Sequence, residues 1–242
     1  MRKKQKTETA PRARKVVKRV GNADGRVHDE LYAAIINHRI PPGTPLQEEE
    51  LARAFGVSRT VIRKALQRLA HGRLVELVPN KGASVAKPSA EEARYVFEAR
   101  HALERTLIDK VISKADDTQI AALVKTAKRE QLAFERGNKQ ERVKLSGAFH
   151  SQLAEIGGNP VLTEFLTELI SRTSLIIALY ESPGAVPCSH SEHLEIATAI
   201  QRRDRVKALK FMEHHLQHIE AQLDLSDSLV QADFRKLFRV GG

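Results

Sequence analysis

A helix predicted to begin after Ser58 carries four polar side chains on the face opposite its apolar residues: Arg59, Thr60, Arg63 and Gln67. An arginine guanidinium matches the paired acceptor atoms on the major-groove edge of guanine. The hydroxyls of Ser58 and Thr60, near the helix N-terminus, suit phosphate oxygens. The pattern favours a helix that reads DNA. For each residue taken singly, a solvated helix face is the alternative.

Such a helix needs a domain that holds its apolar side. Apolar positions at helical spacing predict three helices, whose buried residues are Val27, Leu31, Ala34, Ile35 and His38, then Leu51, Ala52 and Phe55, and finally Ile62, Ala65, Leu66 and Leu69. The first helix stops at Pro41-Pro42-Gly43 because proline lacks an amide hydrogen and restricts the preceding residue. The third begins at Ser58, a good N-cap, and ends near Gly72.

Two short strands are predicted after the third helix. They cover Leu74–Val78 and Ala83–Ala86, and the turn Pro79-Asn80-Lys81-Gly82 joins them. Three helices and a two-stranded ribbon predict a winged helix-turn-helix over residues 23–87. We expect residues 1–22, which lack apolar periodicity, to form a disordered basic tail.

The remainder of the chain is predicted to be almost entirely helical. Ser89 and Glu92 can form a capping box after the short hinge Lys87-Pro88-Ser89. Helices are expected at roughly 90–113, 117–136, 139–156, 160–180, 190–202 and 204–224. The aliphatic, aromatic-poor composition suits a helical bundle over residues 88–225. We expect residues 226–242 to form a C-terminal extension. The fold class is therefore mainly α.

Charge is concentrated at the N-terminus. The formal net charge is +10, of which residues 1–20 contribute +8, residues 21–88 +3 and residues 89–242 −1. A basic front end before a neutral body fits a polyanion-binding protein, and a merely solubilising tail is the alternative.

The composition also excludes several classes of protein. No apolar run approaches the ~18 residues of a transmembrane helix, and no signal peptide is apparent. The single cysteine, Cys188, excludes a disulfide framework or a thiolate zinc cluster. We expect a cytoplasmic protein without a membrane partner.

The segment from Glu50 to Leu69 resembles the GntR family of bacterial transcription regulators. The elements G-V-S-R-T, R-x-A-L-x-R-L and, in the wing, P-N-x-G all occur at the expected separations. The resemblance implies double-stranded DNA as partner, with Lys81 and Gly82 of the wing at the minor groove or backbone. One departure is Glu49, which stands where fatty-acid-responsive members place an arginine, so their operator sequence cannot be transferred.

Residues 90–222 resemble the FCD-type (VanR-like) effector domain of the FadR branch of this family. The matching elements are Glu98-Ala99-Arg100, Leu103-Glu104, Phe149-His150, Gly158-Asn159-Pro160, Glu192-His193 and His214-His215. Many relatives hold a divalent metal with three histidines and an acidic residue, and bind a carboxylate effector there.

The matching positions imply His150, His193 and His215 as ligands of zinc, nickel or a similar ion, with His214 and His218 as competing candidates. The usual acidic position is Ser146 here, a poor metal ligand. Loss of the metal, with the histidines as buried structural side chains, is therefore the alternative.

Arg100 is the first candidate to bind an effector carboxylate, because a buried guanidinium needs an anionic partner and offers two parallel donors. The alternative is an ion pair with Glu104, one helical turn along. Arg172 is the second candidate, with Thr173 and Ser174 beside it as hydrogen-bonding groups.

These features predict a ligand-responsive DNA-binding transcription regulator, expected to be a repressor and not an enzyme. We expect a homodimer on a pseudo-palindromic operator, because a single winged helix covers few base pairs. Two alternatives are a regulator whose signal is the metal itself and a three-histidine metalloenzyme. A catalytic centre would need a general base nearby. Only Glu192 and Glu195 flank a candidate ligand, and we expect them to face solvent or cap a neighbouring helix.

Overall fold

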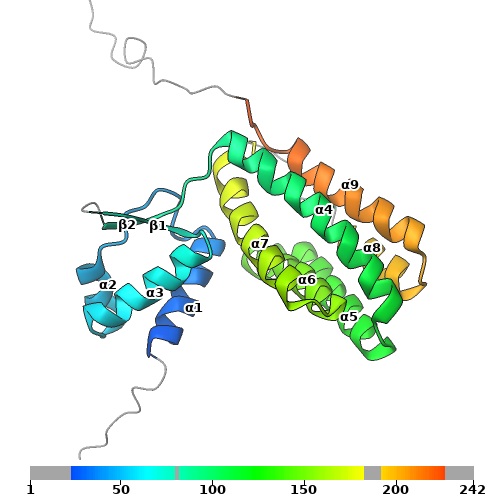
Figure 1. The fold of residues 1–242 in the computed structure, drawn as a ribbon, viewed down its shortest axis with the longest axis horizontal. Helices are drawn as coiled ribbons and strands as arrows, with labels where there is room; N and C mark the ends of the chain where they lie inside the picture. The colour runs from blue at the N-terminus through cyan, green and yellow to red at the C-terminus, as the bar shows by residue number, and fades with distance from the viewer. Residues whose placement is uncertain (1–22, 80–81, 183–191, 227–242) are drawn as a thin grey trace, which may run out of the picture.

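The computed structural model describes residues 23–79, 82–182 and 192–226. Its N-terminal part contains α1 (Ala23–Ile36), α2 (Glu48–Phe55), α3 (Arg59–His71), β1 (Val75–Val78) and β2 (Gly82–Val85). The two strands are antiparallel, with Val75 opposite Val85 and Val78 opposite Gly82. They extend from the three-helix core as a wing (Figure 1).

Local sequence explains where α2 and α3 meet. Gly56 ends α2 at φ 64°, a left-handed conformation that glycine adopts without a steric penalty. Ser58 then caps α3 by accepting a hydrogen bond from the Val61 amide. The apolar side of α3 packs into the core of the small domain, which includes Val27, Leu31, Ile35, Ile62, Leu66, Leu69 and Leu74. The polar face of α3 is left in solvent.

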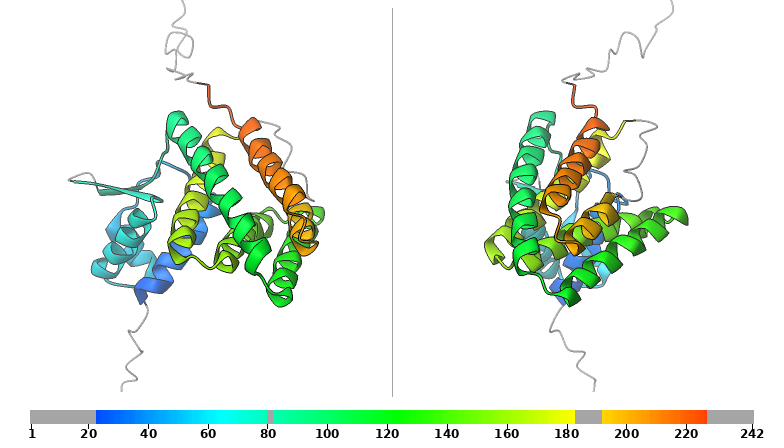
Figure 2. Two further views of the ribbon diagram at one scale, coloured as in Figure 1. Left: turned by 45° about the vertical axis from the view of Figure 1, so that its right-hand side comes forward. Right: turned by 90° about the vertical axis from the view of Figure 1, so that its right-hand side faces the viewer.

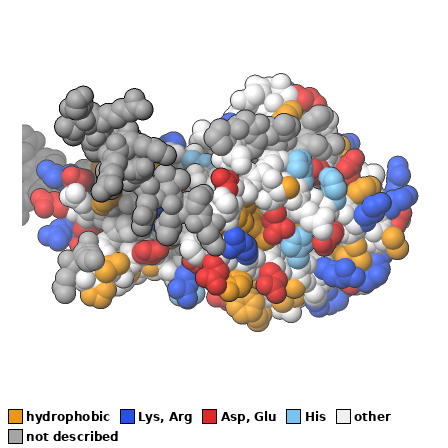
Figure 3. Space-filling view, turned by 90° about the horizontal axis from the view of Figure 1, so that it is seen from above, with side chains coloured by type: hydrophobic (Ala, Val, Ile, Leu, Met, Phe, Trp, Pro, Cys, Tyr) orange, Lys and Arg blue, Asp and Glu red, His pale blue; other side chains and the backbone are white. Residues whose placement is uncertain are grey.

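The C-terminal part is a bundle of α4 (Ala90–Lys114), α5 (Asp117–Glu135), α6 (Lys139–Gly157), α7 (Pro160–Tyr180), α8 (Glu192–Gln201) and α9 (Arg205–Ala221). Side-chain caps start most of these helices, at Ser89, Asp116, Asn138, Asn159 and Asp204. The long helices α4 and α9 run side by side across one side of the bundle (Figure 2). Acidic and basic side chains are interspersed over the described part of the face in Figure 3.

The two parts share a contact between α1 and α7, the bundle helix nearest the winged helix (Figure 1). Leu175 of α7 is fully buried within the apolar core of the small domain. Tyr32 Oη lies 3.2 Å from Ser171 Oγ, and His38 Nε2 lies 3.0 Å from the Ser174 carbonyl oxygen. Ser174 Oγ donates to the Ile36 carbonyl at 3.1 Å. The contact is thus both apolar and hydrogen-bonded.

The structure confirms a mainly helical fold with an N-terminal winged helix-turn-helix and a helical C-terminal domain. Two details differ. α1 ends at Ile36, and His38 adopts φ 56° beyond it, where it contacts α7. Ser89 caps α4, but the Glu92 side chain pairs with Arg172 and does not complete a capping box. The predicted tail, Asn80 and Lys81, Cys188 and residues 227–242 lie outside the described residues. Within the described part of the chain, no helix is long and apolar enough to cross a membrane.

Candidate metal centre and nucleic-acid interface

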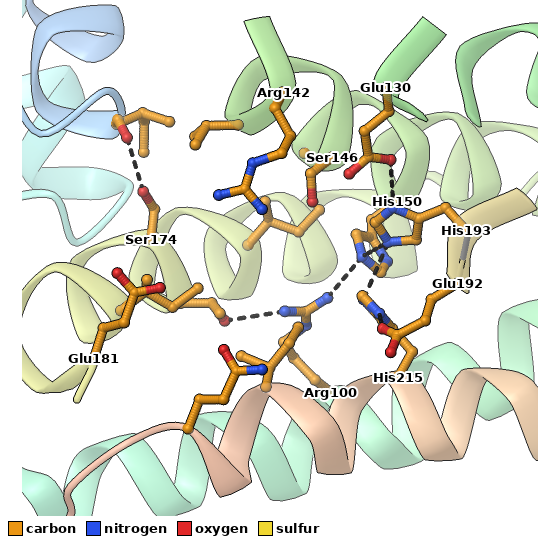
Figure 4. A pocket seen from close by; sticks show the side chains of 18 of the residues that line it. Arg100, Glu130, Arg142, Ser146, His150, Ser174, Glu181, Glu192, His193 and His215 are labelled. Carbon is orange, nitrogen blue, oxygen red and sulfur yellow. Dashed lines mark hydrogen bonds and ion pairs between the residues drawn. The ribbon is translucent and has the colours of Figure 1, made fainter. Parts of the chain in front are cut away.

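Three histidines from three helices meet inside the bundle. His150 lies on α6, His193 on α8 and His215 on α9, and all three are buried. His193 Nε2 lies 3.1 Å from His150 Nε2 and 3.0 Å from His215 Nε2. Figure 4 shows the three rings converging on one point at the end of a cavity. The structure therefore brings together the trio implied by the resemblance.

A carboxylate fixes the orientation of each ring. His150 Nδ1 lies 2.5 Å from Glu104, His193 Nδ1 lies 2.5 Å from Glu130, and His215 Nδ1 lies 2.8 Å from Glu192. An Nδ1 that donates to a carboxylate carries the proton of the neutral ring, so each Nε2 presents a lone pair to the other two. Carboxylate–histidine pairs of this kind orient and polarise metal ligands.

The geometry of the trio and the ionisation of His150 and His215 fit a metal ion. Two imidazole nitrogens bound to one ion at about 2.0–2.1 Å lie roughly 3.0–3.4 Å apart, as observed here. Burial, which outweighs Glu104, lowers the pKa of His150 to about 4. Burial and the neighbouring His193 hold the pKa of His215 well below its usual value. Neutral imidazoles at pH 7 are competent ligands, and the trio can hold a metal ion.

The carboxylates were the part of the centre that the sequence analysis missed. Glu130 was not considered, and Glu104 was considered only as a partner of Arg100. The expectation that Glu192 faces solvent was wrong: it is 4% exposed and accepts hydrogen bonds from both His215 and His218. His218 therefore pairs with Glu192 and does not join the trio. His214, which precedes His215 on α9, is exposed to solvent.

Arg100 lies beside the histidines, and it also forms the ion pair considered as the alternative. Its side chain is buried, and its Nε donates to Glu104 at 2.8 Å. Another guanidinium nitrogen lies 3.3 Å from His150 Nε2, and a third donates to Thr173. Although burial raises the pKa of Glu104, Arg100 and His150 outweigh that effect and lower it, so the carboxylate is ionised.

The structure does not bring Arg172 to this site. Its guanidinium pairs with Glu92 of α4 and with Glu168 one turn earlier on α7. Arg172 points to a different side of α7 from Thr173, which does line the cavity. Arg142 and Ser146 of α6 are among the residues that line the cavity.

The cavity has a volume of about 140 Å³ and extends from the histidines to the winged helix. Ile36 and His38, at the end of α1, line it together with Ser174 of α7. A molecule in this cavity therefore reaches the contact between the two domains.

The predicted DNA-reading residues share one exposed surface. Ser58, Arg59, Thr60, Arg63 and Gln67 are all exposed on or beside α3. Glu48 of α2 accepts two hydrogen bonds from Arg63, at 2.9 and 2.8 Å, and lies 3.6 Å from Arg59. The hydrogen bonds from Arg63 lower the pKa of Glu48. Gly82 opens β2 at φ 89°, next to Lys81, which lies outside the described residues.

Two family models match the chain. "Bacterial regulatory proteins, gntR family" matches residues 24–85, and "FCD domain" matches residues 95–218. The HTH-type transcriptional repressor RspR of Escherichia coli is 29% identical over 197 residues, which cover 80% of this chain and 86% of that protein. The repressor NanR of Cronobacter sakazakii is 28% identical over 221 residues, which cover 81% of this chain and 83% of that protein.

Solved structures share the fold. E. coli McbR/YncC superposes with a TM-score of 0.72 at 18% identity, covering 82% of this chain and 95% of that one. A GntR regulator from Rhodococcus superposes with a TM-score of 0.69 at 24% identity, covering 82% of this chain and 96% of that one. The chain therefore belongs to the GntR family of bacterial transcription regulators, with an FCD domain following its winged helix.

Proposed function

We propose that the chain is a transcriptional repressor that binds operator DNA through α3 and responds to a small carboxylate held at a metal ion in the bundle. The observation that carries the effector part is the convergence of three Nε2 atoms whose rings are each oriented by a carboxylate. The similarity to RspR and NanR, which are named repressors, supports repression.

His150, His193 and His215 would hold zinc, nickel or a similar divalent ion, because neutral imidazoles suit these metals. When bound, the ion supplies positive charge and open positions for oxygen ligands. Ser146, one turn before His150, offers a hydroxyl in place of a carboxylate, which leaves that side of the centre less negative. A less negative centre favours an anionic ligand.

Arg100 would orient the ligand's carboxylate. Its guanidinium already lies against His150, and its pairing with Glu104 fixes its direction. Charge-assisted hydrogen bonds from a positioned arginine are among the strongest available to a carboxylate. Because Arg100 is buried, the low dielectric around it would strengthen this contact.

On the DNA side, Arg59 and Arg63 would contact base edges, with Ser58, Thr60 and Gln67 at phosphates or bases. Glu48 pairs with Arg63 and lies near Arg59, so DNA would compete with this carboxylate for both arginines. Lys81 and Gly82 of the wing would contact the minor groove or the backbone. A homodimer would place two α3 helices on a pseudo-palindromic operator.

The contact between α1 and α7 gives the effector a route to the winged helix. Thr173 and Ser174 line the cavity, and the next residue, Leu175, lies in the core of the DNA-binding domain. A ligand that shifts α7 would therefore change the placement of α3. Coupling between such sites is typically ~1–3 kcal/mol.

The test is an operator titration of the wild type and His193→Ala, with a duplex enriched from random DNA on the wild-type protein. Each protein is titrated with and without butyrate, succinate and glutarate, and thermal melts control for folding. We expect His193→Ala to bind DNA but lose the response, while His214→Ala, changed at an exposed histidine, keeps it. A folded, metal-free His193→Ala that responds fully would remove the metal from the mechanism.

A further inference from the structure

A second guanidinium lines the cavity, apart from the histidines and Arg100. Arg142 lies on α6, two turns before His150, and is half-buried. Figure 4 shows its side chain directed into the cavity towards Ser146. Within residues 23–79, 82–182 and 192–226, Arg142 makes no ion pair and no side-chain hydrogen bond.

The neighbouring carboxylates are already engaged. Glu104, Glu130 and Glu192 each accept a hydrogen bond from a histidine of the centre. Ser146, on the same face of α6 one turn from Arg142, is neutral. The remaining acidic group of the cavity, Glu181 at the end of α7, lies across from Arg142 in Figure 4. Since none of these carboxylates pairs with Arg142 in the described part of the chain, its half-buried guanidinium can bind an anion from outside.

The spacing of residues along α6 sets how long a molecule must be to contact both His150 and Arg142. Arg142, Ser146 and His150 follow one another at four-residue intervals, each about 6 Å apart along the axis. Figure 4 shows the Arg142 guanidinium in the cavity on the far side of Ser146 from the histidines, so a linear molecule that contacts both must extend past Ser146. The cavity volume of about 140 Å³ admits a molecule of this size.

We propose that Arg142 is a second anion-binding residue and that the effector is a small dicarboxylate. One acid group would lie at the histidine centre beside Arg100, and the other at Arg142. Glu181 on the opposite side would repel the second group and direct it to Arg142. The inference rests on the proposed function, since it assumes that the first acid group binds at the histidines.

The test is calorimetric titration of the full-length, zinc-loaded protein with pairs of acids of equal carbon number. Each pair compares a dicarboxylate with a monocarboxylate: succinate with butyrate, glutarate with pentanoate, and adipate with hexanoate. In the wild type, at least one dicarboxylate should bind roughly tenfold or more tightly than its partner. Arg142→Gln should lose this preference and keep the affinity for the monocarboxylate. Arg142→Lys should keep part of it.

Lys144→Gln is the matched control, because it removes the same charge from an exposed position of α6. It should behave as the wild type. An unchanged preference in folded Arg142→Gln, or equal binding of both acids in every wild-type pair, would overturn the role of Arg142 alone. Absence of binding by either series to zinc-loaded wild type would instead overturn the proposed carboxylate effector, and this inference with it.

Discussion

Leu175→Ala should uncouple the bundle from the winged helix. Leu175 is 0% exposed and belongs to α7, yet it packs in the core of the DNA-binding domain. Truncation of a fully buried leucine costs about 2–5 kcal/mol, through lost burial and the cavity left behind. That loss is of the same order as a typical allosteric coupling of ~1–3 kcal/mol, or larger. We therefore expect the variant to bind operator with little or no response to the acids that act on the wild type.

The assay combines calorimetric unfolding with operator titration. Leu175→Ala should shift the unfolding of the winged helix to lower temperature, away from that of the bundle. Leu166→Ala is the control, because Leu166 is equally buried on the same helix but packs only in the bundle core. If Leu175→Ala unfolds together with the bundle and keeps the full response, the contact between α1 and α7 does not carry the signal.

Three further predictions concern DNA and the histidines. Arg59→Ala or Arg63→Ala should cost roughly 1–3 kcal/mol of specific binding in operator titrations; wild-type affinity in both would refute the reading role of α3. Deletion of residues 1–20 should weaken binding to all sequences and reduce its salt dependence, and an unchanged salt slope would leave the tail a solubility element. Metal-free protein should lose stability in melts as pH falls from about 6.5 towards 4, since unfolding frees His150 to bind a proton there; pH-independent melts would contradict this.

Much of the fold and of the DNA-reading surface could be predicted because both follow local patterns. The polar face of α3 and its cap at Ser58 depend only on residues of that helix and the residue before it. The pairing of Arg63 with Glu48 was not predicted, because it joins residues of two helices whose crossing no local pattern defines.

The metal centre could be predicted only in part. The histidines were found through their positions in known motifs, whereas Glu104 and Glu130 come from helices 46 and 63 residues away from their partners. Helical spacing shows that such residues share a face but not which histidine they meet. The sequence likewise predicts Leu175 as an ordinary residue of the bundle core. Its place in the core of the winged helix depends on how the two domains pack.

The metal content of purified protein shows whether the three histidines hold an ion. Full-length wild type, His215→Ala and His214→Ala are loaded with zinc or nickel, dialysed and analysed for metal per chain. His214 and His215 are adjacent on α9, but only His215 faces the centre. We expect about one ion per chain in wild type and His214→Ala, and little or none in folded His215→Ala. Wild type without metal, or equal retention by the two variants, would contradict it.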